Sequence, residues 1–423
     1  MIIKSLLYIK LSNISIIFLM SALMLLSICG FSNNSTMGVN WTFPYFSGAA
    51  NINSLFKWEI SPSDFDAVRS VVGAGYNLDE YKYYKHKTTD DAIINTVNNY
   101  GYVLIVWLSM QLFPYLGDIQ GVLLLQIIVH FIASLFIILH LIRDHLNKVI
   151  FILIYAANPL IIHFVTYSFY YSWMFVPSLL FAIAVLRKEW LIYLLAIAAP
   201  VLLFSILIRP TTLFISILFF IFAFFISNRA SVKFLTLIMF GVFSFGVFFI
   251  SKNSTGSPWH TIYIGVGAYE NNLGVPDLGD NRGYEYFYQK TGIKINTDAI
   301  YGNYNDEKIH KTYMNSLKNR YFEIITEDPI QLIKNAIQNG VKVFSIGYLD
   351  RYPSLSWLIN IQAIMLIAFL IYAKQYIWIF AVVSSAFGFF LYFPPVPSYN
   401  FGAYLLLVFG FLSAISHIRN KAL

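Results

Sequence analysis

Charged residues are scarce in this chain, and cysteine is nearly absent. Only 12% of its 423 residues are Asp, Glu, Lys or Arg, whereas ordinary soluble domains contain about 25%. The single cysteine, Cys29, excludes an intrachain disulfide. No His/Cys cluster has the spacing of a zinc site, and no phosphate loop of the Gly-x4-Gly-Lys-Ser/Thr type occurs. These absences argue against a soluble domain, a metal site and a nucleotide-binding loop.

Apolar residues dominate instead, because 58% of the chain is hydrophobic and 18% is aromatic. Apolar runs of nearly twenty residues recur along most of the length, which is typical of a polytopic helical membrane protein. The net charge of +7 is explained by cationic loops that meet anionic lipid headgroups, so no nucleic-acid partner is expected. We predict an all-α polytopic membrane protein with about 10–11 transmembrane helices, and no cofactor.

Two long polar segments interrupt the apolar runs and set the expected organisation. The expected spans lie near residues 13–31, 119–142, 149–166, 172–187, 190–208, 211–227, 233–250, 357–373, 376–393 and 399–416. The corresponding regions are a first transmembrane helix (1–31), an extracytoplasmic loop with an interfacial or re-entrant helix (32–118), a transmembrane bundle (119–250), an extracytoplasmic segment (251–355) and C-terminal transmembrane helices (356–423).

Short turns with and without charge alternate along the bundle. RDHLNK (143–148), RKEW (187–190) and NRASVK (228–233) are charged, whereas 158–171 carries no charge. The positive-inside rule places the charged turns and both termini in the cytoplasm. We therefore expect a multi-pass protein of the bacterial cytoplasmic (inner) membrane, with both long polar segments outside.

The apolar segment 101–116, GYVLIVWLSMQLFPYL, is the exception to this pattern. If it crossed the membrane, the two long segments would lie on opposite sides and the charge alternation would fail. We therefore expect a helix at the outer interface or a re-entrant one.

Arg209 stands in SILIRPTTLF, at the outward turn between two expected spans. Pro210 fixes the backbone where the chain reverses. One interpretation is that Arg209 extends to lipid phosphates and only marks the turn. The other is an anion site, because the planar guanidinium donates paired hydrogen bonds to phosphate.

Acidic residues of the first outer segment are candidates for a general base. Asp79 and Glu80 precede Tyr81, Tyr83 and Tyr84, and a carboxylate among aromatic rings can have its pKa raised toward a useful value. Asp66, in the first turn of an expected helix, is a third candidate. Surface solvation is the commonest alternative for each of them.

The second outer segment carries further candidates. Trp259 and His260 precede a strand-like apolar stretch, and Arg282 lies in a loop with Asp277 and Asp280. Beyond this loop, the spacing of apolar residues predicts helices over 305–325 and 329–346, the second capped by Asp328.

The order of these elements resembles the GT-C superfamily of integral membrane glycosyltransferases over roughly residues 1–260. Asp79-Glu80 is similar to its acidic motif in the first outer loop, and SILIRPTTLF is similar to its Arg-Pro span start. The outward turn with Asn158-Pro159 fits the same order. Two features depart from the superfamily pattern: the first acid, Glu59, lies well into the loop, and 158–171 has no second acid. No metal is therefore assigned.

The resemblance implies transfer of a sugar from a polyprenyl-phosphate-linked donor to an envelope or surface-polysaccharide acceptor, a glycan or a lipid. The donor phosphate would meet Arg209, with His260 or Arg282. The carboxylate of Asp79, Glu80 or Asp66 would be the catalytic general base that deprotonates the acceptor hydroxyl.

Two alternatives stay open. A repeat-unit polymerase or ligase for O-antigen or capsule is also polytopic and basic, and depends more on outward arginines than on a single acid. A lipid-linked-sugar flippase or transporter would be favoured by charges deep inside spans. No Asp, Glu, Lys or Arg lies within 14–27 or 119–142.

Overall fold

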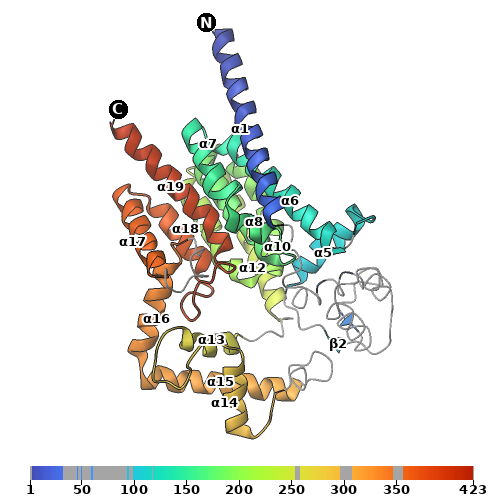
Figure 1. The fold of residues 1–423 in the computed structure, drawn as a ribbon, viewed down its shortest axis with the longest axis vertical. Helices are drawn as coiled ribbons and strands as arrows, with labels where there is room; N and C mark the ends of the chain where they lie inside the picture. The colour runs from blue at the N-terminus through green and yellow to red at the C-terminus, as the bar shows by residue number, and fades with distance from the viewer. Residues whose placement is uncertain are drawn as a thin grey trace.

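A computed structural model of the chain describes residues 2–31, 45, 49, 59–60, 93–94, 99–116, 118–252, 258–295, 307–345 and 356–422. Most of these residues are helical, and turns and loops connect the helices (Figure 1). The β-structure among the described residues is one short antiparallel pair, in which β1 (Glu59–Ile60) is hydrogen-bonded to β2 (Ile93–Ile94). The predicted all-helical class is therefore confirmed.

The apolar bundle contains elements from both ends of the chain. They are α1 (Ile2–Phe31), α5 (Tyr100–Leu112), α6 (Asp118–Phe136), η2 (Ile137–Leu141), α7 (His145–Phe151), η3 (Ile152–Ala156), α8 (Pro159–Val165), η4 (Tyr170–Met174), α9 (Phe175–Leu186), η5 (Lys188–Trp190), α10 (Leu191–Ile208), η6 (Pro210–Thr212), α11 (Leu213–Ile226), α12 (Ala230–Lys252), α17 (Ser356–Tyr372), α18 (Tyr376–Ala386) and α19 (Phe401–Ala422). The last helix is central: α19 packs on both α9 and α18, and its residues Tyr404 to Phe409 are buried.

A second group of helices lies beyond one end of this bundle (Figure 1). It consists of α13 (Trp259–Gly265), η7 (Val266–Ala268), α14 (Asn281–Thr291), α15 (Glu307–Glu327) and α16 (Pro329–Lys342). We call these elements the lower unit. Their core is separate from that of the bundle and includes Tyr263, Phe287 and Tyr313. Both chain termini and α7 lie at the opposite end of the molecule (Figure 1).

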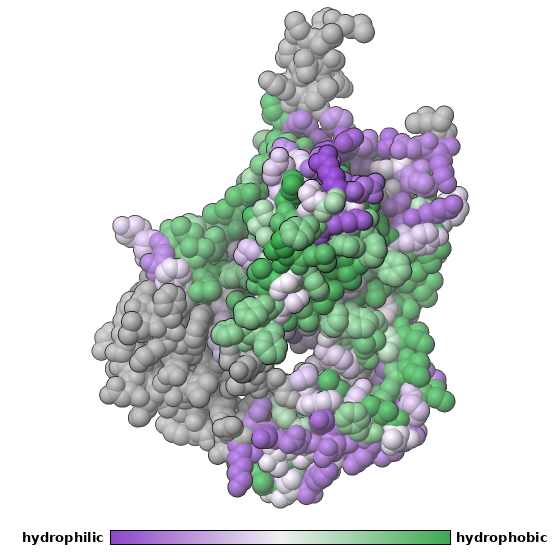
Figure 2. Space-filling model, turned by 180° about the vertical axis from the view of Figure 1, so that it is seen from behind, coloured by the Kyte–Doolittle hydropathy of each residue, from purple (hydrophilic) through white to green (hydrophobic). Residues whose placement is uncertain are grey.

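Among the described residues, five helical segments are long and apolar enough to cross a membrane. They are Asn13–Gly30, Ile119–Leu141, Lys188–Ile208, Ala230–Ser251 and Phe401–Lys421. A sixth candidate is a pair of helices, His145–Ala156 and Pro159–Val165, bent by 53°. A multi-pass membrane protein is thus supported by length and composition, and Figure 2 shows an apolar surface between two hydrophilic ends.

The other four predicted spans are helical but short. Tyr170–Leu186, Pro210–Ile226, Trp357–Tyr372 and Tyr376–Ala386 belong to the apolar helices of 10–17 residues, whereas a straight crossing takes about 20. The predicted total of about 10–11 spans depends on these four. The segment 101–116 corresponds to α5 (Tyr100–Leu112), a 13-residue helix, and the residues that follow it. Its expected place at the outer interface, or its re-entry, stays a prediction.

Local sequence explains several helix starts. Asp144, Asn158 and Asp328 each accept a hydrogen bond from a backbone N–H of the helix that follows. Pro159 and Pro329 occupy the first helical positions, where a missing N–H costs nothing. The predicted cap at Asp328 is confirmed.

The strand-like interpretation of the stretch after His260 is wrong, because Trp259–Gly265 is the helix α13. Short apolar runs do not distinguish strands from buried helices by periodicity alone. Here Tyr263 and Ile264 enter the core of the lower unit from a helix. Gly265 lies so close to Phe393 and its neighbour Tyr392 that an added Cβ would approach the Tyr392 carbonyl oxygen to 1.8 Å.

Candidate anion-binding site

Arg209 occupies the junction between two apolar helices. Helix α10 ends at Ile208, Arg209 is extended (φ −154°, ψ 114°), and Pro210 begins η6. The backbone of Arg209 is satisfied on both sides, because its N–H donates to Ser205 O (2.8 Å) and its carbonyl accepts from Thr212 N (3.1 Å). These two hydrogen bonds therefore fix the backbone that carries the Arg209 side chain.

Tyrosine rings surround the Arg209 guanidinium. Its Nη1 donates a hydrogen bond to the Tyr170 hydroxyl at 2.7 Å. Its Cζ lies 5.0 Å from the centroid of the Tyr170 ring and 5.1 Å from that of the Tyr399 ring. Cation–π contacts of this kind fix the plane of a guanidinium without neutralising its charge. We call Arg209, Tyr170 and Tyr399 the arginine–tyrosine site.

No carboxylate pairs with Arg209 among the residues that the structure describes. Four other arginines in those ranges do form ion pairs with acids, namely Arg187, Arg282, Arg320 and Arg419. A guanidinium has five N–H donors, and Tyr170 takes one of them. The remaining positive charge and donors of Arg209 match the requirements of an anionic oxygen group such as phosphate.

Aromatic packing extends the arginine–tyrosine site toward α5. The Tyr45 ring contacts the rings of Tyr102 and Tyr170 edge-on, at 5.2 and 6.2 Å between centroids. Gly101 brings α5 against the end of α10, because a Cβ there would lie 2.7 Å from Ile208 N. The position of the residue before Arg209 therefore depends on a close helix contact.

The chain between α18 and α19 connects this site to the lower unit. Tyr399 packs on Phe389 and Phe393, with ring centroids 5.8 and 5.6 Å apart. Phe393 in turn belongs to the core of the lower unit. At the other side of the turn, a Cβ on Gly388 would lie 3.2 Å from Thr211 Cα. One turn thus touches both the arginine–tyrosine site and the lower unit.

His260 lies in the lower unit, in the middle of a series of three hydrogen-bonded side chains. Its Nε2 is 3.1 Å from Asp280 Oδ1, and its Nδ1 is 2.5 Å from the Tyr313 hydroxyl. The hydrogen bond with His260 lowers the pKa of Asp280 below its ordinary value of 3.8. Gly283 permits this packing, because a Cβ there would lie 3.0 Å from His260 Nδ1. Tyr313 is fully buried, so this series of hydrogen bonds runs from the surface at Asp280 into the core.

Arg282 is held by two acids of the same loop and helix. Its Nη2 is 2.6 Å from Asp277 Oδ2, and its Nη1 is 2.9 Å from Glu285 Oε2. The hydrogen bonds from Arg282 lower the pKa of Asp277 below 3.8, while Asp277 and Glu285 raise the pKa of Arg282. The charge of Arg282 is therefore balanced within the lower unit, unlike that of Arg209.

His260 on α13 and Arg282 on α14 each bind an acid of the loop before α14, whereas Arg209 lies in the bundle. The expectation that Arg282 itself lies in that loop is wrong, because α14 begins at Asn281. No contact between Arg209 and either His260 or Arg282 occurs among the described residues. The predicted catalytic acids Asp66, Asp79 and Glu80 lie outside the described residues. Roles for all six residues stay predictions.

Sequence reasoning missed Tyr170 and Tyr399, the two rings on Arg209. The run Phe169-Tyr170-Tyr171 in the uncharged turn was an available signal, because that turn and Arg209 were both expected outside. Nothing in the sequence singled out Tyr399, which comes from the far end of the chain.

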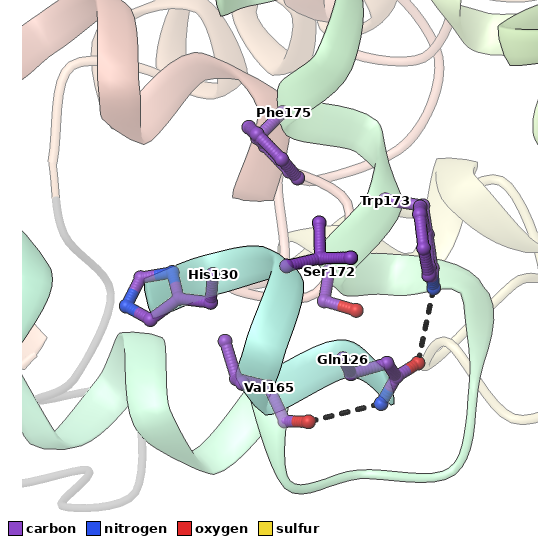
Figure 3. Close-up of a pocket in the computed structure, with 7 residues that line it drawn as sticks. Gln126, His130, Val165, Ser172, Trp173 and Phe175 are labelled. Atoms are coloured by element: carbon purple, nitrogen blue, oxygen red, sulfur yellow. Dashed lines mark hydrogen bonds between the residues drawn. The ribbon is translucent and has the colours of Figure 1, made fainter. Parts of the chain in front are cut away.

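A small, mostly apolar pocket is lined by residues of α6, α8, η4 and the start of α9. Figure 3 shows the Gln126 amide between the Val165 carbonyl and the Trp173 indole, with hydrogen bonds of 2.9 and 3.2 Å. Ser172 also lines it, and its buried Oγ has no hydrogen-bond partner within the part of the chain that the structure describes. His130 Nε2 lies 3.0 Å from Ala156 O, so His130 forms a hydrogen bond between α6 and η3. This pocket supports the segment that carries Tyr170.

Comparison with known proteins gives no match: no protein family, curated protein or solved structure is similar to this chain. The case for a function therefore depends on the residues of the site.

Proposed function

We propose that this protein is a membrane glycosyltransferase with the GT-C arrangement. It transfers a sugar from a polyprenyl-phosphate-linked donor to an envelope or surface-polysaccharide acceptor on the outer side of the bacterial cytoplasmic membrane. The observation that carries the proposal is the arginine–tyrosine site: a rigidly held guanidinium at the end of an apolar helix, with no carboxylate partner among the described residues.

The proposed topology has about 10–11 spans, with the shorter apolar helices crossing as tilted or partial spans. Both termini and α7, which begins within the charged segment 143–148, lie at one end of the molecule, and the lower unit lies at the other (Figure 1). This arrangement supports cytoplasmic termini and an external lower unit under the positive-inside rule.

In the proposed reaction, the lipid tail of the donor lies along the apolar helices and its phosphate binds the Arg209 guanidinium. The bond between the anomeric carbon and the phosphate oxygen breaks, and the acceptor oxygen forms the new glycosidic bond. Asp79 or Glu80 takes the proton of the acceptor hydroxyl, with Asp66 as the third candidate. Arg209 stabilises the negative charge that develops on the departing polyprenyl phosphate or diphosphate.

The test is incubation of the purified protein in nanodiscs with candidate polyprenyl-linked sugars, followed by detection of released polyprenyl phosphate or diphosphate. Arg209→Ala is expected to reduce release about 10²–10³-fold, as loss of a charge-stabilising group does elsewhere. Arg229→Ala is the matched control, because Arg229 is an exposed arginine in the turn between α11 and α12. Undiminished release by Arg209→Ala would contradict the proposal.

A repeat-unit polymerase or ligase is the second candidate, favoured by the fact that the described site is built around an arginine. Asp79→Asn, Glu80→Gln and Asp66→Asn separate the two candidates. For the glycosyltransferase, the variant of the true base is expected to lose about 10²–10⁴-fold of its rate. If Arg209→Ala is inactive and all three acid variants retain activity, the polymerase or ligase is the better assignment.

A further inference from the structure

Helix α16 reverses the usual polarity of an amphipathic helix on a protein surface. Its sequence is PIQLIKNAIQNGVK. Ile330, Ile333 and Ile337 recur at three- and four-residue spacing on one face. This face points away from the protein, because the three side chains are 62%, 58% and 62% exposed. We call it the isoleucine face.

The opposite face of α16 is polar and buried. Asn335 and Asn339 are 4% and 0% exposed. Asn335 Nδ2 donates to Val266 O at 3.3 Å, and Asn339 Nδ2 donates to Phe390 O at 2.9 Å. The amide oxygen of Asn339 accepts from the Tyr269 hydroxyl at 2.8 Å. These bonds fix the rotation of α16, so the outward direction of the isoleucine face is set by satisfied hydrogen bonds.

A helix in water would place its polar face outward, because exposed apolar side chains gain nothing from water. In a bilayer the preference reverses, and polar groups turn toward protein partners. Another helix of the lower unit, α14, shows the water-facing pattern: Gly283 and Phe287 are buried, and Glu285, Gln289 and Lys290 are exposed. The lower unit thus exposes an apolar face on α16 and a polar face on α14.

The isoleucine face continues into the apolar surface of the bundle. Helix α16 packs on α17, and the two helices lie one above the other along one edge of the molecule (Figure 1). On α17, Trp357, Ile361 and Ile364 are 56%, 45% and 57% exposed. The view from behind shows this edge as apolar in both the bundle and the lower unit (Figure 2). Lys334 is exposed on α16, where its long stem can extend to headgroups.

We infer that the isoleucine face of α16 is immersed in the bilayer at the boundary between headgroups and acyl chains. The apolar region of the bilayer then extends past α17 as far as α16, so this part of the lower unit lies within the membrane. This inference concerns lipid contact alone and is independent of the proposed transferase activity.

The test places a fluorescent label at Ile333→Cys in a full-length Cys29→Ser background. The labelled protein is reconstituted into phosphatidylcholine vesicles with or without bromine on the acyl chains, and iodide is the aqueous quencher. Phe245→Cys on α12 is the lipid-facing reference, because Phe245 is 71% exposed within a candidate span. Gln289→Cys on α14 is the exposed water-facing reference.

The label at Ile333→Cys is expected to be quenched by brominated lipid at least half as strongly as the label at Phe245→Cys, and to resist iodide. Quenching by iodide alone, as expected at Gln289→Cys, would overturn the inference. Resistance to both quenchers, with label-to-label energy transfer between copies, would instead assign the face to a second copy of the chain. Ile330→Cys repeats the measurement if the first variant does not fold.

Discussion

Arg209 in the bundle and Arg282 in the lower unit carry the same charge in opposite surroundings. Arg282 donates to two carboxylates at 2.6 and 2.9 Å. Arg209 contacts tyrosine rings and a single hydroxyl. The resemblance drawn from the sequence assigned both to the donor phosphate, Arg209 from the turn between two expected spans and Arg282 from the second outer segment. The partners distinguish them: acids cancel the charge of Arg282, whereas rings orient Arg209 and leave its charge in place.

Arginine-to-lysine exchange sharpens this comparison most strongly. Arg209→Lys is expected to reduce release of polyprenyl phosphate about 10²-fold, because lysine lacks the planar fork and the stacking surface. Arg282→Lys is expected to change the rate less than tenfold, since a lysine can still pair with Asp277. Steady-state release in nanodiscs measures both. Equal losses in the two variants would mean that both cations contact the donor.

The contact between the two regions is tested at Gly265. Gly265→Ala would force a Cβ against the Tyr392 carbonyl, where the backbone cannot give way easily. We expect a loss of about 1–3 kcal/mol in the free energy of unfolding, as for other overpacked sites. Thermal unfolding followed by tryptophan fluorescence measures it. The control is Gly241→Ala on α12, whose Cβ would meet open space and which is expected to be neutral or slightly stabilising. An unchanged free energy of unfolding in Gly265→Ala would show that the lower unit and the turn at Tyr392 do not pack as closely as described.

Substitutions of the two tyrosines that contact Arg209 are expected to lower the rate by different amounts. Tyr170→Phe removes the hydroxyl that accepts from Arg209 and keeps the ring. The loss of one hydrogen bond, about 0.5–1.5 kcal/mol, predicts a decrease in rate of about 2- to 13-fold. Tyr399→Phe keeps the ring that contacts the guanidinium and is expected to have the smaller effect. The apparent donor affinity and the rate of release measure the difference, and a larger loss in Tyr399→Phe would contradict this division.

The smallest expected effect is a pH dependence in the lower unit. The folded-state pKa of Asp277 lies below 3.8 because Arg282 and the Gly279 N–H bind its carboxylate. Its contribution to stability is therefore complete above pH 3.8 and is lost as the pH falls through the lower folded-state value. Asp277→Asn should lower the midpoint of thermal unfolding at pH 6, and the difference from the wild type should shrink below pH 3.8.

The control for this measurement is Glu270→Gln, whose carboxylate forms no ion pair within the described part of the lower unit. It is expected to leave the midpoint nearly unchanged at both pH values. A difference for Asp277→Asn that stays constant down to low pH would exclude the ion pair as its cause.

The sequence predicted those parts of the fold that depend on local patterns. Apolar runs located the helices, and Asp328 marked a helix start through the hydrogen bond that a cap accepts. The helical state of α13 was not predicted, because it depends on contacts between distant segments. Gly265, for example, packs on a turn more than a hundred residues further along the chain.

The sequence predicted one residue of the candidate site, Arg209, but not the residues that surround it. Arg209 stood out because a charge within apolar sequence requires a reason. Its partners Tyr170 and Tyr399 come from two other turns, and chain order alone does not bring them together. The polarity of α16 is a similar case. Periodicity predicted an amphipathic helix, but only the hydrogen bonds of Asn335 and Asn339 reveal which face points outward.

Gly101 connects α5 directly to the turn that carries Arg209. Its missing side chain lets α5 rest on the backbone at Leu207 and Ile208, immediately before Arg209. Any shift of α5 along α10 must therefore displace the residue that precedes the guanidinium. Engineers who wish to replace α5 or shorten the chain before it should keep position 101 free of a side chain, since even a methyl group there would wedge the two helices apart.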